Sequence, residues 1–129
     1  MKNIFWISSY PKSGNTLVRT IITSLFFTDD GIFDFKLLNK IPIIEDTSNL
    51  EFVKNIKIDD YNNLHKEEII SKYWLKMQTK ENLRLNGDFM FVKTHHALVK
   101  VLNNSFTTRE NTLGIIYVVR DPRDVVLSM

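Results

Sequence analysis

Three stretches of the chain are almost continuously apolar and rich in β-branched and aromatic residues. They cover residues 3–10, 89–95 and 112–119. Strands that are buried on both faces of a parallel sheet show this pattern, because neither face of such a strand meets water. The sequence therefore predicts three buried strands, with the first of them central in the sheet.

Apolar residues at helical spacing follow the first predicted strand. They are Leu17, Val18, Ile21, Ile22, Leu25 and Phe26. Gly31, after Asp29 and Asp30, is the expected stop of this helix. Near the other end of the chain, Asp121 and Pro122 fit an N-cap followed by proline at the first helical position. A further helix is predicted to begin there.

The pattern is least informative over residues 32–88. Ser48 and Glu51 fit a capping box that would start a short helix. A longer helix is predicted over about residues 62–80. Its stripe is marked by Leu64, Ile69, Tyr73 and Lys76-Met77, with Lys-Glu pairs on the solvent side. A turn is predicted at residues 86–88, where the chain reads Asn-Gly-Asp.

Predicted strands that are separated by helical segments are typical of an α/β fold. We expect one domain over residues 1–129, built as a three-layer, P-loop-like α/β unit with a parallel sheet and flanking helices. A helix that begins at Asp121 would normally return to the sheet. The C-terminal part of the domain is therefore expected to be missing.

Composition excludes several classes of function. The chain has 129 residues, of which 43% are apolar, enough for one core. Lys and Arg number 17 and Asp and Glu 15, for a net charge of +2 without any basic block, so no nucleic-acid partner is expected. The lack of cysteine excludes disulfides, thiolate metal sites and cysteine nucleophiles. No secretory signal or membrane-spanning stretch is recognised, so we expect a cytoplasmic protein without a membrane partner.

The segment "YPKSGNT" joins the first predicted strand to the first predicted helix. Backbone N–H groups at a helix start lack acceptors and lie where the helix dipole is positive, which favours an anion. Gly14 lets a ligand approach the backbone closely. Lys12 adds a full charge, and Ser13, Asn15 and Thr16 add side-chain donors for phosphate oxygens. The alternative is an ordinary strand-to-helix turn with Thr16 as the helix cap.

The residue order in this loop differs from that of a Walker A loop, because the lysine precedes the only glycine. Together with "YVVRDPRDVVLS" near the end of the chain, the loop instead resembles the two cofactor signatures of cytosolic-type sulfotransferases. In that family the first segment holds the 5′-phosphosulfate of 3′-phosphoadenosine 5′-phosphosulfate (PAPS). The second holds the 3′-phosphate through an Arg and a Ser eight residues apart.

Arg120 and Ser128 have this spacing. An Arg at the carboxyl end of a strand and a Ser on the next helix can both face the crevice above a parallel sheet. The resemblance therefore implies that these two residues bind the 3′-phosphate of PAPS. The alternative for Arg120 is a surface ion pair with Asp121 or Asp124.

A third segment, "FVKTHHAL", is similar to the Lys-Thr/Ser-His of the family, whose His is the catalytic base. The resemblance assigns this role to His95, since a neutral imidazole can accept the proton of an attacking hydroxyl. Adjacent strand residues point to opposite faces, so His96 is expected to point away. His65 lies among charged residues on the predicted helix and is given no role.

The resemblance implies a PAPS-dependent sulfotransferase that uses no metal and acts on a hydroxyl or amine of a small-molecule acceptor. Lys12 would stabilise the leaving phosphate. Leu17 stands where the family commonly has the Trp that stacks on adenine, and the downstream segment that completes the cofactor site is absent. Residues 1–129 alone are therefore expected to show little or no transferase activity. The alternatives are a P-loop kinase of nucleotides or small molecules, and a non-catalytic nucleotide-binding fragment.

Overall fold

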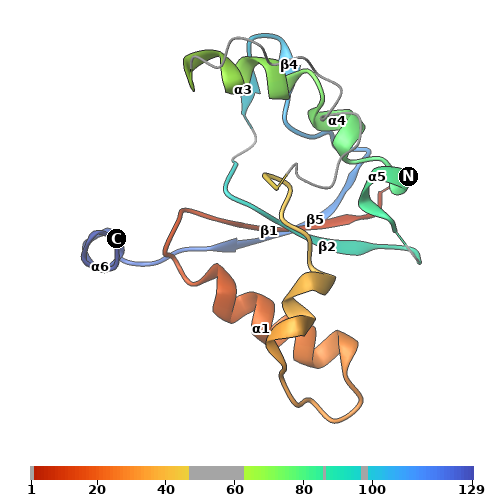
Figure 1. The fold of residues 1–129 in the computed structure, drawn as a ribbon, viewed down its shortest axis with the longest axis vertical. Coiled ribbons are helices and arrows are strands. Elements are labelled where there is room, and N and C mark those ends of the chain that lie inside the picture. The colour runs from red at the N-terminus through yellow and green to blue at the C-terminus, as the bar shows by residue number, and fades with distance from the viewer. Residues whose placement is uncertain (1, 47–62, 86, 97–98) are drawn as a thin grey trace.

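The computed structural model describes residues 2–46, 63–85, 87–96 and 99–129. Its centre is a three-stranded parallel sheet in the order β2-β1-β5, shown in Figure 1. The strands are β1 (Ile4–Ser9), β2 (Met90–Thr94) and β5 (Thr112–Val118). All three predicted strands and the central place of the first are confirmed. Because the strands are parallel, their carboxyl ends lie along one edge of the sheet.

Helices cover both faces of this sheet (Figure 1). One face carries α1 (Asn15–Phe27) and the 3-10 helix η1 (Phe35–Lys40). The other side carries α3 (Asn63–Ser71), α4 (Trp74–Met77), α5 (Lys80–Leu83) and the small antiparallel pair of β3 (Lys100–Val101) with β4 (Asn104–Ser105). The helix α6 (Pro122–Leu127) extends past the carboxyl ends of the strands. The predicted three-layer α/β architecture is confirmed.

The two faces of β1 belong to two separate core clusters, as the alternation of side chains along a strand requires. Ile4 and Trp6 face the cluster on the side of α4, and Phe5 and Ile7 face the cluster on the side of α1. The first cluster also contains Ile44, Trp74, Met77, Val92 and Phe106, and the second Ile22, Ile41 and Phe91. Burial on both faces explains the continuous apolar sequence of β1.

Gly114 lies where β5 passes closest to β1. A Cβ atom added there would come within 2.5 Å of the Phe5 ring. The register between the two strands shifts at the same place, since Ile4 pairs with Thr112 whereas Phe5 pairs with Gly114. A side chain at this position would have to displace the Phe5 ring.

The single helix predicted over residues 62–80 is wrong. The described residues of this range form two short helices, α3 and α4, and α5 begins only at Lys80. Trp74 and Met77 of α4 are buried in the core beside the sheet. Thr79 is the N-cap of the next helix, α5, because its side chain accepts a hydrogen bond from the Asn82 backbone N–H. Packing and a local cap therefore outweigh the helical pattern. The predicted capping box at residues 48–51 lies outside the described residues.

Two elements arise where the sequence predicted none. A 3-10 helix, η1, follows Asp34, whose side chain accepts a hydrogen bond from the Lys36 N–H. The chain then runs beside β2, where Ile43 and Lys93 form a parallel bridge. The second is the antiparallel pair of β3 and β4 in the connection before β5. The segment after η1 matters for function because it leads to Glu45.

Large apolar side chains are exposed directly after β5 and on α6. The exposed fraction is 73% for Val119 and 85% for Leu127. On α1, Leu17 and Leu25 are exposed as well. Among the described residues, no helix is both long enough and apolar enough to cross a membrane.

Candidate functional site

The loop between β1 and α1 turns through two left-handed residues. Lys12 has a φ of 63° and Gly14 a φ of 104°. The Ser13 N–H donates to the Tyr10 carbonyl at 3.3 Å. Gly14 is the N-cap of α1 and gives no side-chain cap, so the alternative of a turn capped by Thr16 is wrong. The first backbone N–H groups of α1 consequently have no side-chain cap. They point out of the N-terminus of the helix, where the helix dipole is positive.

Asn15 supports this loop from inside. Its side chain is buried, and its amide nitrogen donates to the Ile7 carbonyl at 3.2 Å and to the Ser9 hydroxyl at 3.1 Å. Both amide hydrogens are therefore used within the protein, and the predicted side-chain donor to phosphate is not free. The backbone N–H of Asn15 is unaffected. The side chains of Lys12 and Thr16 are exposed beside the loop.

Arg120 comes to this loop from the other end of the chain. Its guanidinium Nη1 donates to the Lys12 carbonyl at 3.3 Å. The carboxylate of Asp121 instead accepts from Arg123, at 3.1 Å from Nε and 2.7 Å from Nη2. The alternative pairing of Arg120 with Asp121 is therefore not the one that forms. Asp121 also caps α6 through the Arg123 N–H, as predicted.

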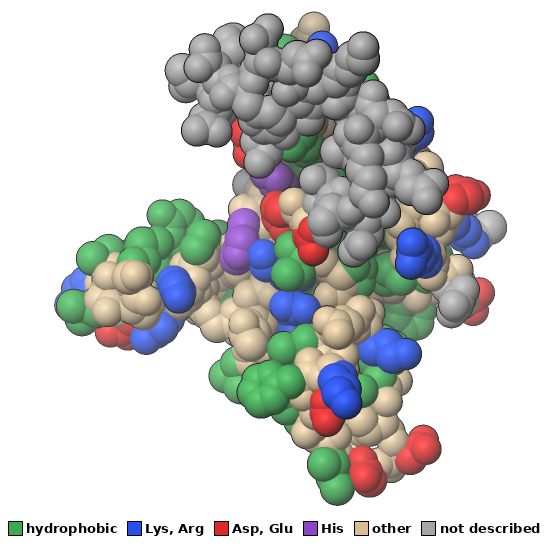
Figure 2. All heavy atoms as spheres, in the orientation of Figure 1, with side chains coloured by type: hydrophobic (Ala, Val, Ile, Leu, Met, Phe, Trp, Pro, Cys, Tyr) green, Lys and Arg blue, Asp and Glu red, His purple; other side chains and the backbone are tan. Residues whose placement is uncertain are grey.

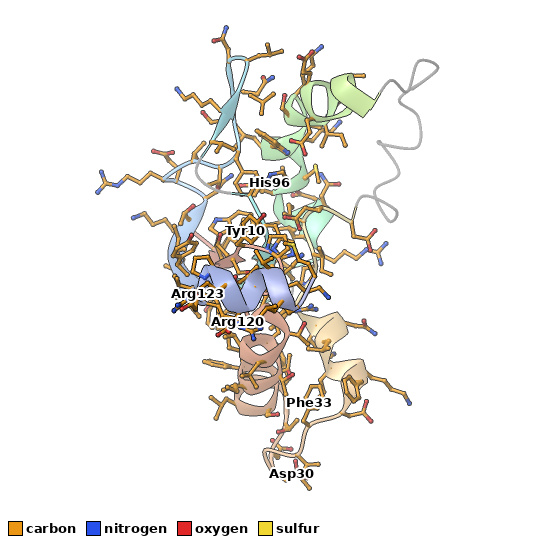
Figure 3. All side chains as sticks on the ribbon, turned by 90° about the vertical axis from the view of Figure 1, so that its left-hand side faces the viewer. Tyr10, Asp30, Phe33, His96, Arg120 and Arg123 are labelled. Carbon is orange, nitrogen blue, oxygen red and sulfur yellow. The ribbon has the colours of Figure 1, made fainter. Side chains whose placement is uncertain are left out.

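Ser128 lies just after α6, at the opposite end of that helix from Arg120. Its hydroxyl donates to the Val125 carbonyl at 2.8 Å. The structure thus brings Arg120 to the loop by a direct contact, whereas the Ser128 hydroxyl bonds to its own helix. Figure 3, which looks onto α6, shows Tyr10 between His96 above and Arg120 below.

His95 follows directly after β2 and contacts the end of β1. Its ring Nδ1 lies 2.7 Å from the Ser9 carbonyl oxygen and 3.5 Å from the Ser9 hydroxyl. A carbonyl oxygen only accepts, so Nδ1 must carry the hydrogen. In the neutral imidazole, Nε2 is then the nitrogen with the lone pair. The contact selects the tautomer that a general base needs.

Glu45 holds the same strand end from the other side, a role that the sequence did not reveal. Its Oε1 accepts hydrogen bonds from the Thr94 hydroxyl, at 2.8 Å, and from the His95 N–H. Its Oε2 lies 3.7 Å from the Lys93 ammonium. Burial opposes ionisation of Glu45, but the two hydrogen bonds and the charge of Lys93 outweigh it and lower its pKa below the ordinary value. Burial also lowers the pKa of Lys93.

His96 lies in different surroundings from its neighbour. Its ring packs against Trp74 and Phe106, with centroids 5.3 Å and 4.9 Å away. The backbone N–H of His96 donates to the Thr94 hydroxyl, and the backbone carbonyl of His96 accepts from the Ser8 hydroxyl. The two histidines are therefore divided between the β1 end and an aromatic cluster. Figure 2 shows histidine side chains on one face, with acidic and basic side chains beside them.

The arrangement combines a loop whose helix start has no side-chain cap, a cation that contacts this loop and a histidine with a defined tautomer, all at the carboxyl edge of a parallel sheet. Open α/β sheets bind their ligands at this edge. Within the described ranges, no group of three or more His, Asp or Glu side chains is placed to hold a metal ion. The side chain of His65 is not among those described.

A comparison with protein families matches the model of the sulfotransferase domain to residues 2–129. Comparisons with curated proteins and with solved structures gave no match. The matched range includes the loop, the strand end with its two histidines, and α6.

Proposed function

The chain belongs to the sulfotransferase domain family, and on this premise we propose that it transfers a sulfuryl group from PAPS to a small-molecule hydroxyl or amine. The observation that carries the proposal is the contact between Arg120 and the Lys12 carbonyl. It places the two segments that resemble the cofactor signatures of the family side by side. A site for two phosphate-bearing ends of one nucleotide needs this proximity.

The loop fits the 5′ end of PAPS. Left-handed backbone at Lys12 and Gly14, followed at once by the start of α1, leaves N–H groups available to phosphate oxygens. The exposed Lys12 ammonium and Thr16 hydroxyl can reach the same anion. Lys12 is proposed to neutralise the charge that develops on the leaving phosphate.

The 3′-phosphate of PAPS is proposed to bind Arg120 and Ser128. The Arg120 guanidinium has five N–H donors and gives one of them to the Lys12 carbonyl, so the others remain available for a phosphate. The Ser128 hydroxyl would have to rotate away from the Val125 carbonyl in order to donate. Its oxygen lies at the end of α6, two helical turns beyond Arg120.

His95 is proposed as the general base. PAPS supplies an activated sulfuryl group bonded to a phosphate leaving group. His95 Nε2 accepts the proton of the acceptor hydroxyl while the oxygen–sulfur bond forms and the bond from sulfur to phosphate oxygen breaks. The Ser9 carbonyl keeps Nδ1 protonated and stabilises the imidazolium that results. Glu45 fixes the backbone on which this ring stands.

A direct test is to compare nucleotides by titration calorimetry. The proposal predicts that 3′-phosphoadenosine 5′-phosphate, the nucleotide product, binds at least about 10-fold more tightly than ADP, since Arg120 adds a charge-assisted contact to the 3′-phosphate. A P-loop kinase would favour ADP with Mg²⁺. Tighter binding of ADP would therefore contradict the proposal.

A further inference from the structure

A pocket of about 210 Å³ lies beside the strand end that carries His95. Its described lining consists of Ile44, Glu45, Glu67, Ile70, Trp74, Met77, His96 and Phe106. These residues come from the segment after η1, from α3 and α4, from the end of β2 and from the residue after β4. The pocket thus lies on the sheet face opposite α1.

The inner wall of the pocket is apolar and aromatic. Trp74, Phe106 and His96 form a mutually packed group of rings, with the Trp74 and Phe106 planes 81° apart. Ile70 and Met77 add aliphatic surface. An apolar cavity of about 150 Å³ holds a benzene-sized molecule. A space of this size and lining suits one ring with a short substituent.

The polar part of the described lining is acidic. Glu45 and Glu67 both line the pocket, and no Lys or Arg is found among its described lining residues. The charge of Glu45 is partly balanced by Lys93, 3.7 Å from its Oε2, whereas Glu67 lies exposed on α3. A positively charged group on the ligand would be attracted to both carboxylates and to the faces of the aromatic rings.

The pocket is connected to the proposed base through Glu45, and His95 itself is not among the described lining residues. Glu45 is one of the lining residues, and the Glu45 carboxylate accepts a hydrogen bond from the His95 N–H. His96, the next residue, forms part of its wall. A ligand in the pocket therefore lies next to the backbone that positions His95.

We propose that this pocket is the acceptor site, and that it takes a compact alcohol or phenol with a single ring and a cationic amine. The acceptor role rests on the proposed sulfuryl transfer, whereas the binding chemistry does not. In the transfer, the acceptor hydroxyl loses its proton to His95 and gains the sulfuryl group, and the nucleotide leaves with the electron pair of the broken bond. The amine stays protonated beside Glu67 and takes no part in the reaction.

The test uses three matched compounds: 4-(2-aminoethyl)phenol, which is cationic, 4-ethylphenol, which is neutral, and 3-(4-hydroxyphenyl)propanoate, which is anionic. Binding to the protein without nucleotide is followed by NMR, using the indole signal of Trp74 and the ring signals of His96. The cation should bind about 10-fold more tightly than the anion, as expected for two nearby carboxylates. Equal affinity, or preference for the anion, would overturn the inference.

Glu67→Gln should weaken the binding of the cation about 3-fold and leave that of 4-ethylphenol unchanged. The matched control is Glu110→Gln, which removes the same charge from an exposed turn before β5. An effect of Glu110→Gln equal to that of Glu67→Gln would overturn the placement of the ligand. If the cation binds as expected but an enzyme form that sulfates other phenols does not sulfate it, the acceptor role fails. If no acceptor is sulfated at all, the proposed function fails, and the binding result still decides the pocket chemistry.

Discussion

The guanidinium of Arg120 donates a hydrogen bond to the backbone carbonyl of Lys12, although the two residues are 108 positions apart in the chain. The contact connects the start of α6 to the loop before α1. The contact uses one of the five guanidinium N–H donors of Arg120 and leaves the others for further partners. Because Arg120 contacts the loop and is the proposed ligand of the 3′-phosphate, it should affect nucleotide selectivity more strongly than Arg123, which pairs with Asp121.

We therefore predict that Arg120→Ala removes the preference for nucleotides with a 3′-phosphate. A charge-assisted contact is worth about 1.5–3 kcal/mol, so PAPS should lose roughly 10-fold or more in affinity, and adenosine 5′-phosphosulfate much less. Competition calorimetry on both nucleotides measures the ratio. Arg123→Ala is the control, since Arg123 pairs with Asp121. If the two variants lower the ratio equally, the role given to Arg120 is wrong.

The strands and the start of α6 could be predicted from the sequence because their causes are local. Ile4 and Val92 are completely buried, and a strand with two buried faces must be apolar along its length. Asp121 and Pro122 act on the first turn of their own helix. Such features need no knowledge of the remaining chain.

The rest depends on contacts between distant segments. Glu45 bonds to Thr94 and His95, 49 and 50 residues further along the chain, and nothing in its own segment marks it. The break between α3 and α4 follows from the burial of Trp74, which the helical pattern does not contain. The sequence predicts Asn15 as a ligand donor, but its amide nitrogen donates to the Ile7 carbonyl and the Ser9 hydroxyl of β1.

His95→Ala should lower turnover by roughly 10²-fold or more in an active form of the protein, the usual weight of general-base catalysis. His96→Ala should lower kcat at saturating acceptor far less and should act on KM instead, because the His96 ring packs against Trp74 and Phe106 in the wall of the proposed acceptor pocket. ¹⁵N NMR of the imidazole rings should also find Nδ1 of His95 protonated. A reversed ranking of the two variants would refute the choice of base.

Glu45→Gln should destabilise the protein at neutral pH, since it weakens two hydrogen bonds to a charged acceptor. The loss should be about 1 kcal/mol, the difference between a charged and a neutral hydrogen bond. The pKa of Glu45 is lower in the folded protein than its ordinary 4.5, so this stabilisation is present above pH 4.5 and is lost as pH falls through the folded value. Urea unfolding of both proteins at pH 7 and near pH 3 measures it. A stability difference that does not shrink on acidification would contradict the account of Glu45.

Asn15→Ala should lower the free energy of unfolding by about 1–3 kcal/mol, because it leaves the buried Ile7 carbonyl without this donor. Thr16→Ala removes an exposed hydroxyl and should change stability by less than about 0.5 kcal/mol, while still weakening nucleotide binding. Denaturant unfolding measures the stability of both variants, and calorimetry measures their affinity for the nucleotide. Together the two measurements distinguish a residue that supports the loop from one that contacts the ligand. Equal losses of stability would show that Asn15 does not support the loop.

The binding of 3′-phosphoadenosine 5′-phosphate to Lys12→Ala tests most directly whether the loop before α1 holds the 5′-phosphate. Lys36→Ala, which removes an exposed ammonium from η1, is the matched control. Calorimetry should find binding to Lys12→Ala weakened by about 10-fold or more, as expected for a lost charge-assisted contact, and binding to Lys36→Ala unchanged. A folded Lys12→Ala protein that binds the nucleotide as tightly as the wild type would contradict the placement of the phosphate on this loop.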